Sequence, residues 1–278
     1  MTLTYVYCLV RSPRTPAVSS APVSMPGAKP VRALHAGGDV WLIVSTVPAA
    51  QYDEAALATG LTNLDWVGRR AMTHEVIVEH FLTAPAVLPM QLFTLFTTDE
   101  RALEHIARER RRVDRILARL DRQQEWGLRL SFDEKGARQA VEDAHRPPSR
   151  KGSRRPGRTV PAESGAAYLA RKRDLRDVTG AQLTAAKRAA DRLYRAMSRE
   201  ATESRRRTAT EQATPGSRLL LDAAFLLPRA KANAFRNTLR QHARKLTGSG
   251  LVVSLTGPWP PYNFVDGGAR RTVRKTKR

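Results

Sequence analysis

The chain has 278 residues, a formal net charge of +22 at pH 7 and one cysteine. Its 41% of apolar residues is close to the average of globular proteins, which excludes wholesale disorder despite the charge. Because one thiol cannot form an internal disulfide, a disulfide-stapled secreted domain is also excluded, and the cytoplasm is the expected compartment. No apolar stretch approaches the about 20 residues that a spanning helix needs, so no membrane span is expected.

Strand and helix patterns alternate along the first 133 residues. Leu3, Tyr5 and Tyr7 share one face of a predicted strand, which indicates that this face is buried. The expected elements are a strand at 2–10, a Pro/Ser/Ala/Gly-rich loop at 11–38 that reads as a mobile insertion, a strand at 39–47, a helix from Asn63 or Asp65 to about Leu82, a strand at 87–96, one long helix capped by Asp99, and a strand at 125–132.

A second block of elements follows a stretch rich in Arg and Pro. It opens with a long helical segment at about 163–207, whose apolar stripe includes Tyr168 and Leu175. An apolar run at 219–227 predicts a buried strand, a stripe from Ala232 to Leu246 predicts a helix, and 251–255 predicts a last strand.

We therefore expect an α+β protein of two small domains, the second ferredoxin-like with a long helical segment. The predicted organisation is an N-terminal domain at 1–133, a basic linker at 134–161, a C-terminal domain at 162–265 and a basic tail at 266–278.

The positive charge is concentrated in two segments. Residues 147–160 carry five basic and no acidic side chains, and residues 266–278 carry six basic and one acidic. Neither contains an aromatic side chain to stack on bases, so a solvated role is favoured. Nucleic-acid binding through the linker and tail stays open as the alternative function, because clustered Lys and Arg displace counterions from phosphate.

Catalytic and metal-binding patterns are incomplete in this chain. His74-Glu75 begins like a metalloprotease helix, but Val78 stands where the second histidine should be, so we expect His74 at the surface or in a cap. Residues 152–159 mimic a phosphate loop without its flanking strand and helix. No metal or cofactor site and no enzymatic activity are expected.

The segment 255–265 is not explained by generic packing. Three prolines in four residues, Pro258, Pro260 and Pro261, favour an extended rod that cannot join the interior of a sheet. Trp259, Tyr262 and Phe264 project from this rod as bulky anchors. Two readings remain open: the rod folds back over its own domains, or it docks on another protein.

This segment resembles the closing signature of the gas vesicle protein GvpL/GvpF family, Thr-Gly-Pro-Trp-Pro-Pro-Tyr-x-Phe-Val. Five further segments resemble the family in the expected order, at 64–77, 87–96, 125–130, 167–172 and 221–227. The main departure lies within 87–96, where the family usually reads Leu-Pro-Leu-Arg-Phe-Gly-Thr. Gln91 replaces the Arg, Leu92 the Phe and Phe93 the Gly.

The resemblance implies a non-enzymatic accessory protein of gas vesicle formation, located at gas vesicles within the cytoplasm. Its implied partners are the small hydrophobic gas vesicle shell protein and other gas vesicle accessory proteins. Because buried aromatic side chains dominate the energetics of interfaces, the expected partner-binding residues are Trp259, Tyr262 and Phe264. Gln91 joins them on the reading that the family's arginine organises a partner site. On the other reading, that arginine only satisfies backbone carbonyls, and Gln91 can partly substitute for it.

Overall fold

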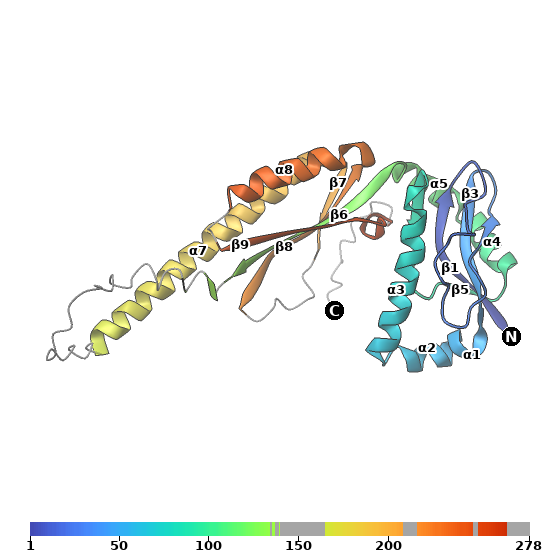
Figure 1. The fold of residues 1–278 in the computed structure, drawn as a ribbon, viewed down its shortest axis with the longest axis horizontal. Coiled ribbons are helices and arrows are strands. Elements are labelled where there is room, and N and C mark those ends of the chain that lie inside the picture. Colours follow the sequence, from blue (N-terminus) through green and yellow to red (C-terminus); the bar gives the residue numbers. More distant parts are fainter. Residues whose placement is uncertain (134, 137–138, 140–164, 208–215, 247–249, 266–278) are drawn as a thin grey trace, which may run out of the picture. The chain divides into compact units, whose positions relative to one another are not determined.

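The computed structural model describes residues 1–133, 135–136, 139, 165–207, 216–246 and 250–265. They form an α+β protein with two antiparallel sheets, as the sequence predicts (Figure 1). The chain divides into two compact units that are not sequential segments. The first unit comprises Met1–Trp126, Leu226–Ala230 and the chain from Gly257 on, and the second comprises Gly127–Phe225 and Lys231–Thr256. The expected linker is almost entirely, and the expected tail entirely, outside the described residues.

The first unit contains a sheet with the strand order β2-β3-β1-β4, and β5 also pairs with β1. Its strands are β1 Thr2–Arg11, β2 Arg32–His35, β3 Val40–Pro48, β4 Ala86–Pro89 and β5 Leu95–Phe96. Its helices are α1 Ala49–Tyr52, α2 Glu54–Gly60, α3 Leu64–His80, η1 Phe81–Thr83, α4 Asp99–Arg108 and α5 Arg110–Arg119. Figure 1 shows α3 and α4 on opposite sides of this sheet. Residues of α4 and α5 line one groove together with Leu9 of β1.

The central strand β1 is buried on both faces. Tyr5 and Tyr7 point to the core under α3, as their alternation predicts. The register against β3 shifts between Val6 and Cys8, which is a β-bulge. Because a bulge inverts the alternation, Cys8 joins Tyr7 in the same core and Leu9 faces α4 and α5. Burial raises the pKa of the Cys8 thiol.

Several expectations for the first unit are wrong in detail. The loop at 11–38 contributes strand β2, and its Met25 and Val31 are buried in the core. The helix at 99–120 is two helices, α4 and α5, that meet at Glu109. Thr98, not Asp99, caps α4 through its side chain, because Asp99 instead forms an ion pair with Arg32. The predicted cap of α3 is confirmed, since Asn63 accepts from the amide of Trp66.

The second sheet has the strand order β7-β8-β6-β9. Its strands are β6 Gln123–Asp133, β7 Glu203–Arg206, β8 Ser217–Pro228 and β9 Leu251–Trp259. The helices of this part of the chain are α7 Gly165–Glu200, η2 Arg229–Lys231 and α8 Ala232–Arg244, and the last short helix, η3 Tyr262–Phe264, belongs to the first unit. The succession β6-α7-β7-β8-α8-β9 with this strand order is the ferredoxin-like arrangement that the sequence predicts.

The long helix of the second unit ends earlier than its pattern suggests. Helix α7 stops at Glu200, and β7 occupies residues that the apolar stripe had assigned to the helix. Ala186, Ala190, Leu193 and Met197 are buried, which confirms the C-terminal half of the stripe. Tyr168 and Leu175 are among the side chains outside the described set.

Candidate functional site

The strand predicted at 87–96 is interrupted between Pro89 and Leu95. A hydrogen-bonded pair, Tyr5 and His74, holds both ends of the interruption. The Tyr5 hydroxyl lies 2.8 Å from Nδ1 of His74, and Nε2 of His74 lies 3.2 Å from the Met90 carbonyl oxygen. At the other end, the Phe93 amide donates to the Tyr5 hydroxyl over 3.2 Å. The bend from Met90 to Phe93 is therefore fixed by the core under α3.

These contacts assign the tautomer of His74. A carbonyl only accepts, so Nε2 carries the proton and Nδ1 accepts from the Tyr5 hydroxyl. His74 is almost fully buried, and burial lowers its pKa to about 4. The expectation of a surface or capping histidine is wrong because the rings of Tyr5 and Tyr7 lie against this face of α3.

The bend carries the residues that depart from the family pattern. Phe93 has φ +65°, in the left-handed region where glycine is favoured. Its ring packs on Trp66 with 5.4 Å between centroids, a contact that glycine could not make. Gln91 is exposed, and its carbonyl accepts from the amide and hydroxyl of Thr94. The tight turn thus holds the Gln91 side chain at the surface.

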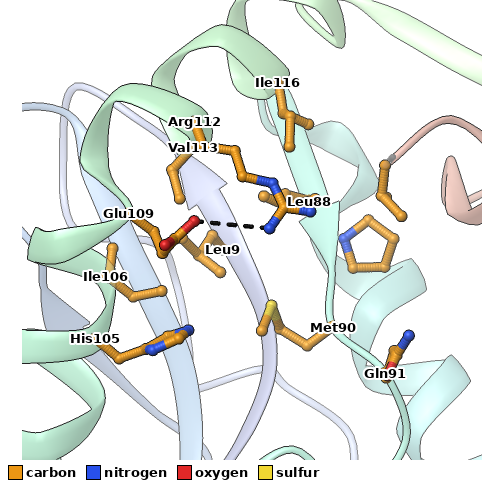
Figure 2. A pocket seen from close by; sticks show the side chains of 12 residues that line it. Leu9, Leu88, Met90, Gln91, His105, Ile106, Glu109, Arg112, Val113 and Ile116 are labelled. Atoms are coloured by element: carbon orange, nitrogen blue, oxygen red, sulfur yellow. Dashed lines mark ion pairs between the residues drawn. The ribbon is translucent and has the colours of Figure 1, made fainter. Parts of the chain in front are cut away.

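Gln91 borders a half-open apolar groove of about 170 Å³ in the first unit (Figure 2). Figure 2 shows Met90 and Gln91 on the strand side and Ile106, Val113 and Ile116 on the helix side. The complete lining is Leu9, Leu88, Pro89, Met90, Gln91, His105, Ile106, Glu109, Arg112, Val113, Ile116 and Val265. Eight of these twelve residues are apolar, so the groove suits an apolar side chain.

The polar rim of the groove lies on the α4–α5 side. Glu109, where the two helices meet, forms an ion pair of 3.6 Å with Arg112, drawn as the dashed line in Figure 2. Both side chains are about half exposed, so the pair contributes little to stability. His105 is exposed beside them. The break at Glu109 therefore places charged and polar side chains beside the apolar floor.

The signature segment closes one side of this groove. Its first part, to Trp259, belongs to β9, an edge strand, which agrees with the expectation that its prolines exclude it from a sheet interior. A Cβ on Gly257, which has φ +124°, would lie 2.9 Å from the Glu125 carbonyl oxygen. The segment then turns into η3 instead of remaining extended, and Val265 reaches the groove.

The end of the segment is anchored in the first unit. Phe264 is fully buried, and Arg119 donates to its carbonyl. The Asn263 amide donates to the buried Glu125 carboxylate over 3.0 Å, and its side-chain amide donates to the same carboxylate. Burial and the neighbouring Glu75 carboxyl raise the pKa of Tyr262. The reading in which the rod folds back over its own chain is the arrangement that the structure has.

The four residues singled out in the sequence have different surroundings. Gln91 lines the groove, whereas Trp259, Tyr262 and Phe264 do not. Phe264 is fully buried, and Trp259 is 37% exposed. The groove residues on α4 and α5 were missed by sequence reasoning, because their apolar spacing has the same pattern as ordinary core packing. The one local signal of the break is Arg110, which stands where the apolar spacing from Ile106 to Val113 calls for an apolar side chain.

Two kinds of site were looked for among the described residues, a metal site and a membrane-spanning helix. No group of three or more His, Cys, Asp or Glu side chains among them has the arrangement of a metal site. Within the same residues, no helix combines the length and apolar composition needed to cross a membrane.

Comparison with known proteins gives one consistent result. A family model described as "Gas vesicle synthesis protein GvpL/GvpF" matches residues 3–266. The chain is 31% identical over 254 residues to "Gas vesicle protein L" of Streptomyces sp. (strain CB03234), covering 90% of this chain and 88% of that protein.

Two crystal structures share the fold at 14% sequence identity. Gas vesicle protein GvpF of Anabaena sp. PCC7120 matches with a TM-score of 0.61 over 95% of this chain and 96% of its own. GvpF of Microcystis aeruginosa matches with a TM-score of 0.62, over 95% of this chain and 98% of that protein. At this identity the likeness shows the fold alone.

Proposed function

The chain belongs to the gas vesicle synthesis protein GvpL/GvpF family, and from this membership we propose a non-enzymatic accessory protein that binds another gas vesicle protein during assembly. The partner is the small hydrophobic shell protein or another accessory protein, and the place of action is the gas vesicle within the cytoplasm. A shell subunit exposes apolar surface before it assembles, so a partner that covers this surface prevents premature association.

The observation that carries the proposal is the half-open apolar groove beside the signature segment. Its floor is apolar, its mouth is polar, and its walls are held by buried contacts of Tyr5, His74 and Phe264. A preformed site of this kind loses little conformational entropy when it binds. The groove is therefore suited to hold an apolar side chain of a protein partner.

The four sequence-derived residues take two roles in this proposal. Gln91 and Trp259 are exposed, so they contact the partner directly. Phe264 and Tyr262 act indirectly. Their packing in the first unit holds Val265 against the groove. Gln91 offers neutral donors and acceptors where an arginine would offer a charge, so it suits a partner that is neutral at this point.

The experiment is co-purification of the tagged full chain with the gas vesicle proteins encoded beside it. The wild-type chain retains at least one of them, and Trp259→Ala retains several-fold less while its melting temperature changes little. Val252→Ala is the matched control, because Val252 is an exposed apolar residue of the same strand β9. A wild-type chain that retains no gas vesicle protein contradicts the proposal.

A further inference from the structure

The helices that form the groove carry an excess of positive charge on the described surface. Asp99, Glu104, Glu109 and Asp114 are each paired with an arginine, namely Arg32, Arg101, Arg112 and Arg110. The only other acid of α4 and α5 is Glu100, in the first turn of α4. Arg108, Arg111 and Arg115 are exposed and have no carboxylate partner among the described residues.

Two of these arginines lie beside the mouth of the groove. Arg115 follows the lining residue Arg112 by three positions on α5, so both occupy the same side of the helix. Arg108 is the last residue of α4 and precedes the lining residue Glu109. The groove thus combines an apolar floor with cations along one edge.

From this combination we propose that the groove binds an acidic amphipathic segment of the partner, in which one bulky apolar side chain enters the groove and flanking carboxylates pair with Arg108 and Arg115. This inference rests on the proposed function, whose partner it describes chemically. An apolar cavity of about 150 Å³ accommodates a benzene-sized group, so a groove of about 170 Å³ holds one side chain such as Leu, Met or Phe.

The apolar side chain and the carboxylates of the partner segment have different roles, because one is buried and the others stay at the surface. The inserted side chain supplies most of the affinity, because it leaves water entirely. The carboxylates remain near the surface, so they raise the association rate and select against basic partners. A nucleic acid offers phosphates for the arginines but no apolar side chain for the floor, so it does not match this site.

The test uses the full chain co-expressed with the gas vesicle proteins, with a photo-crosslinking amino acid at His105, an exposed residue of the lining. The control carries the same amino acid at Met72, an exposed residue on α3. The expected product at His105 is a gas vesicle protein, crosslinked through a segment that has a bulky apolar residue and at least two Asp or Glu within four positions of it.

A charge reversal gives a second measurement. Arg108→Glu with Arg115→Glu is expected to lower retention of the gas vesicle proteins about tenfold and to weaken its salt dependence. Arg69→Glu, at an exposed position of α3, is the matched control and leaves retention unchanged.

The outcomes separate this inference from the proposed function. If the wild type retains gas vesicle proteins but His105 crosslinks none of them, or crosslinks a segment without carboxylates or a nucleic acid, the inference of an acidic segment at the groove is overturned. The proposed binding of a gas vesicle protein stands in that case. Unchanged retention by the double reversal has the same meaning. A wild type that retains no gas vesicle protein overturns both.

Discussion

Two apolar surfaces of the first unit are exposed, and they differ in shape and charge. The groove between β4 and α5 is concave, with Met90 in its lining and Glu109 and Arg112 at its mouth. The outer ridge of α3 is formed by Leu64, Met72 and Val76, spaced four or eight residues apart. Nothing lies within 4 Å of a Cβ built on Gly68, which is in the same row, so the ridge is an open convex face.

The ridge is the more exposed of the two surfaces, with Leu64 85% and Met72 71% exposed. Exposure alone does not identify a partner, because single exposed apolar residues are common on proteins. The groove, in contrast, has a concave shape that fits one side chain, and arginines along one edge that favour an acidic partner. This difference is the reason to propose the partner site at the groove and not at the ridge.

The largest expected effect is that of Phe264→Ala. Removing a fully buried Phe costs about 3–5 kcal/mol of unfolding free energy through lost transfer energy and a cavity. The groove loses its Val265 wall in the same variant, whereas the α3 ridge keeps its residues. Chemical denaturation measures the loss, with Phe264→Leu as the conservative control. A stability within about 1 kcal/mol of wild type would show that the segment is not anchored by this ring.

A smaller effect follows from the buried His74. Its pKa is about 4 in the folded chain and about 6.5 in the unfolded chain, so the unfolded chain binds more protons between these values. Stability therefore falls as the pH drops through this window, by about 2 kcal/mol between pH 8 and pH 5. Glu75 acts in the opposite direction, because burial raises its pKa.

A His74→Gln variant isolates the contribution of this histidine to the pH dependence of stability. Wild type and His74→Gln are unfolded with denaturant at pH 8 and pH 5. The wild type should lose about 2 kcal/mol more than the variant over this interval, since only the wild type must keep an imidazole neutral. Equal losses would mean that His74 is not held neutral between Tyr5 and Met90.

The smallest effect is expected from deletion of residues 267–278. These residues carry charge but few apolar side chains, so the melting temperature and gas vesicle assembly should be unchanged. Any affinity for nucleic acid should fall, and it should be strongly salt-dependent between about 50 and 200 mM. A deleted chain that cannot support vesicles at normal expression would indicate that the tail has a specific function.

The regular parts of the fold could be predicted from the sequence. Alternation located β1 and β6, a continuous apolar run located β8, and helical spacing located α3 and α8, because each of these elements buries apolar side chains. These predictions needed only local periodicity. The predicted succession of elements did not give the ferredoxin-like order, because β6 was assigned to the first domain and the residues of β7 to the preceding helix.

The candidate site could not be predicted in the same way. The break after Pro89 depends on Tyr5 and His74, which are distant in sequence, and the local pattern of 87–96 is that of one continuous strand. The ion pair of Asp99 with Arg32 likewise displaces the expected cap. Gln91 could be singled out, because it departs from the family pattern. Its position at the groove could not, because it depends on the bend from Met90 to Phe93.

Oxidative footprinting of two methionines compares the groove with the ridge in one sample. Met90 lines the groove and Met72 lies on the α3 ridge, and both side chains are oxidised to sulfoxide at rates that follow their access to solvent. When the full chain binds its gas vesicle partner, oxidation of Met90 should slow several-fold while that of Met72 is unchanged. Slower oxidation of Met72 with unchanged oxidation of Met90 would place the partner on the ridge and contradict binding at the groove.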